Sequence, residues 1–174
     1  MNYTLSNKYF LQALDAYPYS LSEVIENLEY ALSYDAEHAG AHCLLGRLYL
    51  EQLKMYDKAA YHFERALAID MNYVVIYEYY SLLLISACDY EKALKLIRFA
   101  NTIKGVNNVI MSYRESIIYE NLKKYNKAIA SMEKAYHLSC NEEERIFIHK
   151  QLARIKKKMV NRKDKNKKKI KVKN

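Results

Sequence analysis

Alanine recurs along this chain of 174 residues at intervals of 35, 34 and 35, at Ala31, Ala66, Ala100 and Ala135. Seven residues before each of them stands a small or β-branched residue: Val24, Ala59, Ala93 and Ala128. A bulky residue comes three positions earlier still: Leu21, Tyr56, Tyr90 and Tyr125. Such a period is typical of stacked supersecondary units, because one unit cannot bury its apolar face alone. The spacing therefore predicts a repeat architecture.

Helix is the predicted element throughout the repeats. Apolar or small residues recur at spacings of three, four and seven, as in Tyr56, Ala59, Phe63 and Ala66, which is the periodicity of an amphipathic helix. The chain has only 3 Gly and 1 Pro, against average usage of about 7% and 5%, so a β-rich fold with many tight turns is not expected. Ser20 with Glu23, and Asn141 with Glu144, have the spacing of capping boxes that open helices. We expect an all-α protein.

The repeated positions resemble the tetratricopeptide repeat family. In the second repeat the pattern is carried by Leu45, Gly46, Tyr49, Tyr56, Ala59, Phe63 and Ala66. In the third it is carried by Tyr77, Tyr80, Ser81, Leu84, Tyr90, Ala93, Ile97 and Ala100, and in the fourth by Ser116, Tyr119, Tyr125, Ala128, Met132 and Ala135. The resemblance implies an α-α superhelix, a solenoid of about four helix hairpins plus a C-terminal capping helix.

The chain departs from the family pattern at several places. The family tryptophan is absent, and its repeat-ending proline is replaced by Ala36, Met71, Gly105 and Cys140. An extra residue lies within 52–55. The small residue at Gly46, Ser81 or Ser116 is expected where two helices cross, because it lets their backbones approach closely.

The predicted organisation is a helical repeat domain over residues 1–160 and a lysine-rich, disordered tail over 161–174. Within the domain the predicted repeats are about 5–38, 39–73, 74–107 and 109–142, followed by a capping helix at about 142–160. Its apolar stripe consists of Ile148, Leu152, Ile155 and Met159, which would leave one face on the stack and one in water.

Charge separates the tail from the repeats. The net charge is +8, but residues 156–174 contribute +10, so the rest of the chain carries −2. Such a run can neutralise the phosphates of nucleic acid or of an anionic surface, or it can be a solvated extension. The candidate polyanion-binding residues are Lys156, Lys157, Lys158, Arg162, Lys163, Lys167, Lys168 and Lys169.

A concave groove is the main candidate site. The resemblance implies that the first helix of each pair lines it, with Cys43, Arg47, Leu50, Glu51, Glu78, Leu82, Ile85, Tyr113, Ile117, Glu120 and Asn121. Apolar centres with a few charges suit a partner peptide or protein. Some of these residues could instead pack internally or against a second copy. Three glutamates would repel a terminal carboxylate, so the carboxylate clamp of one subfamily is not expected.

No catalytic constellation is present, so we predict a non-enzymatic interaction module that needs no cofactor: an adaptor, scaffold or chaperone-like protein. The alternatives are a nucleic-acid- or ribosome-associated protein that uses its basic tail, and a self-associating structural subunit. His38 with His42, and His137 with Cys140, have helical ligand spacing but no third ligand nearby, so no metal site is expected.

The cellular location is predicted from three features. The three cysteines, Cys43, Cys88 and Cys140, do not have the pattern of a disulfide framework, and they are predicted to be small buried hydrophobes rather than reactive thiols. Residues 1–8 lack the pattern of a signal peptide. No apolar stretch reaches the roughly 20 residues needed to span a bilayer. We expect a cytoplasmic protein without a transmembrane segment.

Overall fold

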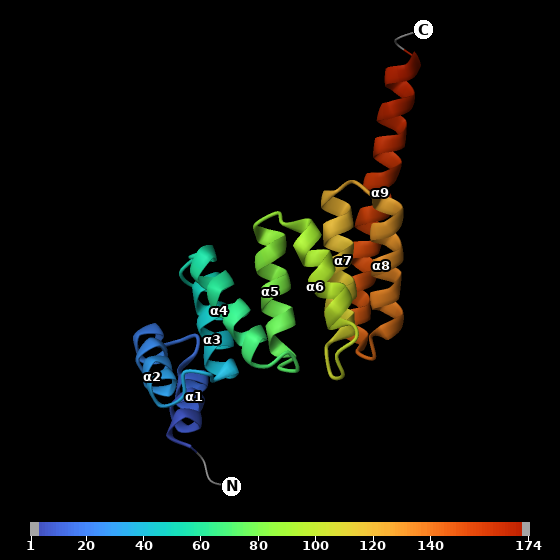
Figure 1. Ribbon diagram of the computed structural model, residues 1–174. Coiled ribbons are helices and arrows are strands. Elements are labelled where there is room, and N and C mark those ends of the chain that lie inside the picture. The colour runs from blue at the N-terminus through green and yellow to red at the C-terminus, as the bar shows by residue number, and fades with distance from the viewer. Residues whose placement is uncertain (1–3, 172–174) are drawn as a thin grey trace. The chain divides into compact units, whose positions relative to one another are not determined.

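The computed structural model describes residues 4–171, with side chains as far as residue 162. This part of the chain forms nine α-helices and no strand (Figure 1). Their bounds are α1 (Leu5–Ala16), α2 (Leu21–Tyr34), α3 (Ala39–Glu51), α4 (Tyr56–Ile69), α5 (Val75–Ser86), α6 (Tyr90–Ala100), α7 (Asn108–Asn121), α8 (Tyr125–Leu138) and α9 (Glu142–Lys171). The prediction of an all-α fold is confirmed.

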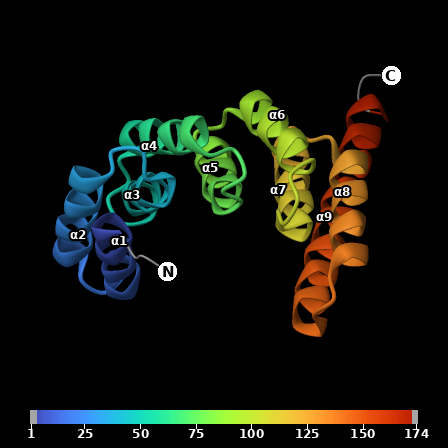
Figure 2. The ribbon, with the colours of Figure 1, turned by 60° about the horizontal axis from the view of Figure 1, so that its bottom comes forward.

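The helices fall into two compact units. The first consists of Met1–Asp89 with Ile103–Gly105, and the second of Tyr90–Thr102 with Val106–Asn174. In the first unit α1 pairs with α2, α3 pairs with α4, and α5 packs against both α3 and α4. In the second unit α7 pairs with α8, α6 packs on α7, and α9 packs on α8 (Figure 2). The boundary between the units falls inside the predicted repeat at 74–107, between α5 and α6.

The recurrent alanines lie in the helix interfaces. Ala31, Ala66, Ala100 and Ala135 are fully buried, and so are Val24, Ala59, Ala93 and Ala128. Gly46 shows why the neighbouring small position matters: a Cβ atom there would lie 2.7 Å from Cε1 of Phe63 on α4. Real Cβ atoms do not approach other atoms that closely, so a larger residue at this crossing of α3 and α4 would force the Phe63 ring to shift.

One turn geometry ends α3, α5 and α7. A non-glycine residue follows each helix in the left-handed region, namely Lys54 (φ 55°), Cys88 (φ 59°) and Lys123 (φ 57°). The next amide donates back to a carbonyl in the last turns, from Asp89 to Leu84 and from Lys124 to Tyr119, as in a Schellman motif. At the corresponding turn Met55 donates to Tyr49, one residue further back. The extra residue predicted within 52–55 accounts for that difference.

Aspartate follows α2 and α4, the second helices of the first two hairpins, one residue before the position at which the family has proline. Asp35 follows α2 and Asp70 follows α4, and each carboxylate accepts a hydrogen bond from the amide two residues on, at 3.0 Å and 2.8 Å. These Asx turns redirect the chain without proline.

The two predicted capping boxes differ from the structure in detail. Ser20 precedes α2 but its side chain makes no capping hydrogen bond. Asn141 Oδ1 does accept from the amides of Glu143 and Glu144, whereas the Glu144 carboxylate accepts from Ser139 Oγ. In both cases the helix starts at the predicted place, because the cap residue fixes the start even when the reciprocal bond is not made.

The last helix is longer than predicted. Its apolar stripe docks on the second unit, with Ile148 and Ile155 buried, as expected for a capping helix. However, α9 continues to Lys171 and extends past the ends of α7 and α8 (Figure 1), whereas residues 161–174 were predicted to be disordered. The last three residues of that predicted tail, 172–174, lie outside the described part of the chain. Lysine is a good helix former and no Gly or Pro follows Cys140, so no residue in this segment terminates the helix.

Candidate peptide-binding surface

The predicted groove residues of α3 divide into buried and half-buried positions. Cys43 and Leu50 are buried in the first unit, so they belong to its core. Burial raises the pKa of the Cys43 thiol to about 12, which makes it unreactive. The prediction of buried cysteines holds for Cys43 and is wrong for Cys88 and Cys140, which are exposed because both lie in connections at helix ends.

Arg47 is held between two aromatic rings on the same face. Its guanidinium carbon lies 4.4 Å from the ring centre of Tyr17 and 4.6 Å from that of Tyr79. Arg47 Nε donates to Glu51 Oε2 at 2.8 Å, and the Tyr17 hydroxyl donates to the same oxygen at 2.6 Å. Burial and the hydrogen bond to Glu51 raise the pKa of Tyr17 to about 12. The stacking fixes Arg47, while its Nη1 and Nη2 groups bond no other described residue.

A small apolar hollow lies beside Arg47. It is lined by residues of α1, α3 and α5 and of the approach to α5, and its volume is about 40 Å³, far below the roughly 300 Å³ of the smallest typical ligand pockets. The hollow is therefore not a ligand pocket by itself. Its rim includes the aliphatic side chains of Leu14 and Val75, which are 40% and 38% exposed. The face therefore presents apolar side chains next to a fixed cation.

The predicted residues of α5 belong to this unit as well. Glu78, Leu82 and Ile85 are all half-buried, so their side chains are accessible in part. Since α5 packs directly against α3, the two helices bring predicted groove residues together within one unit. We call the face formed by Leu14, Arg47, Val75, Tyr79 and Leu82 the α1/α3/α5 surface.

In the second unit α9 engages two of the predicted groove residues of α7. The ring of Tyr113 lies 5.7 Å from that of Phe147. Glu120, whose side chain is 10% exposed, accepts from both Nη groups of Arg154 and from Lys158 Nζ, each at 2.6 Å. Burial raises the pKa of Glu120, but the hydrogen bonds from the two cations outweigh it and leave the pKa below its usual value. Ile117 is half-buried and Asn121 is exposed.

The candidate polyanion-binding residues have unequal surroundings. Lys158 bonds to Glu120, and Lys156 Nζ lies 3.3 Å from Glu133 Oε1. Lys157 and Arg162 are exposed. The side chains of the other four, Lys163, Lys167, Lys168 and Lys169, lie outside the described part of the chain. Pairing with the acidic repeats thus neutralises part of the basic run.

The histidines pair with partners that the sequence did not indicate. His38 Nδ1 accepts from the amide of Ala41 and so caps α3, while its Nε2 lies 3.0 Å from Asn7 Oδ1. His42 Nδ1 lies 3.0 Å from Nδ1 of His62 on α4. Among the described residues no three His, Cys, Asp or Glu side chains are grouped so that they could hold a metal ion.

Sequence reasoning missed Tyr17, Tyr79, Leu14 and Val75 on the α1/α3/α5 surface. The repeat pattern marks positions that pack within a hairpin, and these four residues meet only because separate hairpins stack. An aromatic residue next to the predicted Glu78 was the one available signal for Tyr79.

Comparisons with known proteins identify the fold. No protein-family model matches the chain, and no curated protein matches it in sequence. Among solved structures it is similar to PilF of Pseudomonas aeruginosa, at 19% identity and a TM-score of 0.78, over 90% of this chain and 70% of that chain. PilW, described as a type IV pilus biogenesis factor, has the same identity and TM-score and is covered to 71%.

A third similar structure is MamA from Desulfovibrio magneticus. It is 17% identical with a TM-score of 0.75, over 99% of this chain and 95% of that chain. These similarities show that the chain has the tetratricopeptide-type fold of stacked helical hairpins that its repeats predicted.

No helix in residues 4–171 combines the length and apolar character needed to cross a membrane.

Proposed function

We propose that this chain is a non-catalytic protein–protein interaction module that binds an apolar segment of a partner protein on the α1/α3/α5 surface. The observation that carries the proposal is the pairing of exposed aliphatic side chains with a fixed cation. Leu14 and Val75 are each about two-fifths exposed, and both lie beside the stacked Arg47. Apolar anchors give affinity, and one oriented polar group gives register to a bound segment.

The groups of this surface support binding rather than catalysis. The Cys43 thiol is buried with a raised pKa, and Glu51 is committed to Arg47 and Tyr17. A partner segment with a hydrogen-bond acceptor such as a carboxylate or a backbone carbonyl would meet the Nη groups of Arg47. The free cysteines support our further proposal that the protein works in a reducing compartment such as the cytoplasm.

Two matched substitutions test the binding surface. Val75→Glu places a charge on the rim, while Tyr61→Glu places one on α4, where Tyr61 is 58% exposed. Partners are captured from the native cell with the full-length protein and quantified by mass spectrometry. We expect one or more partners to be lost with Val75→Glu and kept with Tyr61→Glu, at unchanged helicity. Equal capture by both variants would rule out this surface.

Self-association and polyanion binding are the alternatives. A second copy could cover the same apolar rim, in which case light scattering would show a mass that rises with protein concentration. Nucleic acid or an anionic surface would instead engage the basic run at residues 156–173, and that binding would weaken steeply with salt. If the proposal is right, the protein stays monomeric in light scattering. The partner that is lost with Val75→Glu is then a different protein, and its binding does not depend on the basic run.

A further inference from the structure

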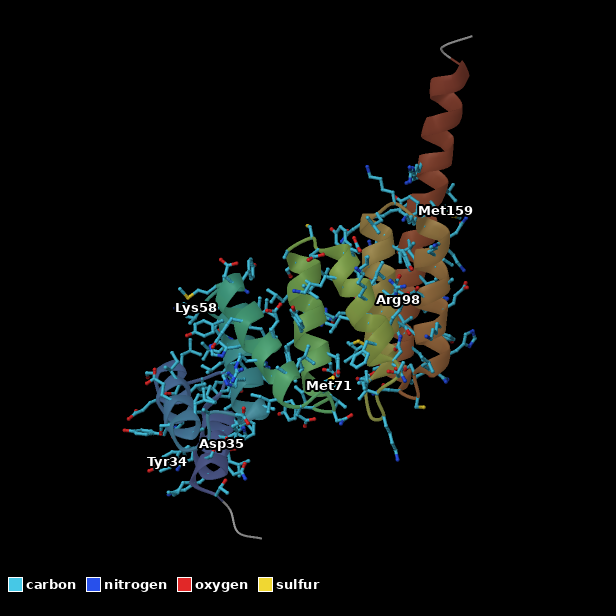
Figure 3. All side chains as sticks on the ribbon, in the orientation of Figure 1. Tyr34, Asp35, Lys58, Met71, Arg98 and Met159 are labelled. Atoms are coloured by element: carbon cyan, nitrogen blue, oxygen red, sulfur yellow. The ribbon has the colours of Figure 1, made fainter. Side chains whose placement is uncertain are left out.

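An open, solvent-exposed pocket of about 450 Å³, which we call the cavity, lies in the second unit between the α7–α8 turn and α9. Four of the residues that line it are cations, Lys123, Lys124, Lys127 and Arg162, and none is acidic. Met159, which also lines it, lies on α9 at the level of that turn (Figure 3). Three of the four cations come from the helical repeats rather than from the basic C-terminal run.

The four cavity cations differ from Arg154, Lys156 and Lys158 of α9 in having no acidic partner. Arg154 and Lys158 pair with Glu120, and Lys156 pairs with Glu133. Within the part of the chain whose side chains are described, the four cavity cations form no ion pair. Like charges gathered around one space repel each other, so an anion bound there would stabilise the site.

Two of the cations are positioned by other contacts. Arg162 Nη1 donates to the carbonyl oxygen of Lys123 at 2.8 Å, and its guanidinium carbon lies 5.7 Å from the ring centre of Tyr125. Lys127 Nζ lies 5.5 Å from the ring centre of Tyr119. A cation that is already oriented loses less conformational entropy when it binds a ligand.

We propose that this cavity binds the adjacent phosphate groups of a compact anion. Lysines act as point charges and the arginine as a planar donor fork, and together they suit the several oxygens of linked phosphates. The volume lies in the range of small-molecule sites. Half-buried Tyr125 and Met159 add an apolar wall. A free polyphosphate and a multiply phosphorylated lipid headgroup share this chemistry.

The test uses inorganic tripolyphosphate and the full-length chain at low salt, with calorimetry as the readout. One variant replaces Lys123, Lys124 and Lys127 by Gln, and a control replaces Lys167, Lys168 and Lys169 by Gln, so both lose the same charge. We expect the first to weaken binding by at least about tenfold and the control by less than about threefold. Equal weakening, or no binding to the unchanged protein, would overturn the proposal.

A second arm separates the two sources. Vesicles of phosphatidylcholine with a bisphosphorylated inositol lipid are compared with phosphatidylcholine alone in co-sedimentation. If the protein sediments with the phosphoinositide vesicles and this depends on the cavity lysines, the ligand is a lipid headgroup. If the protein binds tripolyphosphate but does not sediment with the vesicles, the ligand is a free anion. Binding only to single-stranded RNA, lost in the Lys167–Lys169 control rather than in the cavity variant, would overturn the proposal in favour of the basic run.

Folding of the variants is checked by circular dichroism and thermal unfolding. Arg162→Lys provides a milder change, because it keeps the charge but removes the fork that bonds to Lys123. We expect it to weaken tripolyphosphate binding by about threefold or more. Lys124→Gln serves as a single-residue variant of the cavity. If tripolyphosphate binding were unchanged in both Arg162→Lys and Lys124→Gln, the proposed site would be contradicted.

Discussion

His42 and His62 illustrate how one contact between helices determines the protonation of both partners. The carbonyl oxygen of Ala36 lies 3.2 Å from His42 Nε2 and can only accept, so Nε2 carries the proton. Nδ1 of neutral His42 must then accept from Nδ1–H of His62, 3.0 Å away. Protonation of both rings would place two N–H donors against each other. The contact between α3 and α4 thus opposes a charge on both histidines at once.

This pair predicts that acid weakens the fold. Burial lowers the pKa of both histidines, that of His62 to about 4 from an ordinary 6.5. Between pH 4 and pH 6.5 the unfolded chain binds more protons than the folded protein does. The contribution of His62 to the free energy of unfolding is therefore fully present above pH 6.5 and is lost as the pH falls toward 4. The slope from His62 is at most about 1.4 kcal/mol per pH unit. Urea unfolding at about pH 7.5 and about pH 5 measures it.

The variant His62→Gln supplies the control for that experiment. Without the titrating group, the loss of stability between the two pH values should shrink by about 1–2 kcal/mol. An unchanged loss in the variant would show that other groups cause the acid sensitivity.

Gly46 is the residue on which the packing of α3 against α4 depends most directly. Gly46→Ala places a Cβ against the Phe63 ring and should destabilise the protein by about 1–3 kcal/mol. Adding Phe63→Leu makes room for that atom, so the double variant should be more stable than the sum of the two single changes predicts. Additive losses in chemical denaturation would contradict this close contact.

At the scale of the element, the residue in the left-handed conformation after the first helix of a hairpin lowers the free energy of unfolding. Lys54 has φ 55°, a conformation that costs a residue with a Cβ roughly 1–2 kcal/mol. Lys54→Gly should therefore raise the free energy of unfolding by about 0.5–1 kcal/mol. The same substitution inside a helix, at exposed Lys134 of α8, should lower it by roughly 1 kcal/mol. Losses of equal size in both variants would contradict the turn assignment.

The helices could be predicted from the sequence because each depends on residues near it in the chain. The alanine period marks the buried stripe of α2, α4, α6 and α8, and Gly46 marks a close crossing of α3 and α4. The extension of α9 beyond residue 160 was missed because a charged run was interpreted by its composition alone, although lysine favours helix.

The sites were less predictable for a related reason. The Arg47 cluster joins Tyr17 to Glu51, and α9 joins Arg154 to Glu120, across separations of 34 residues each. No local spacing encodes these contacts. The basic cavity likewise combines a turn at Lys123 with Arg162, so the conclusion that basicity belongs to the tail overlooked three lysines of the repeats.

At the scale of the whole molecule, each unit carries its own proposed site. The first has an apolar rim beside a fixed cation, and the second has a cavity lined by unpaired cations. With both proposed sites, one chain would join a protein partner to a phosphate-bearing ligand.

Site-specific photo-crosslinking in the native cell tests the protein-binding claim most directly. A photoreactive amino acid is placed at Leu14, at Val75, or at Tyr61 on α4 as the exposed control. The account predicts that Leu14 and Val75 form an adduct with the same partner protein and that Tyr61 does not. Adducts of equal yield at Tyr61, or none at either rim position, would contradict it.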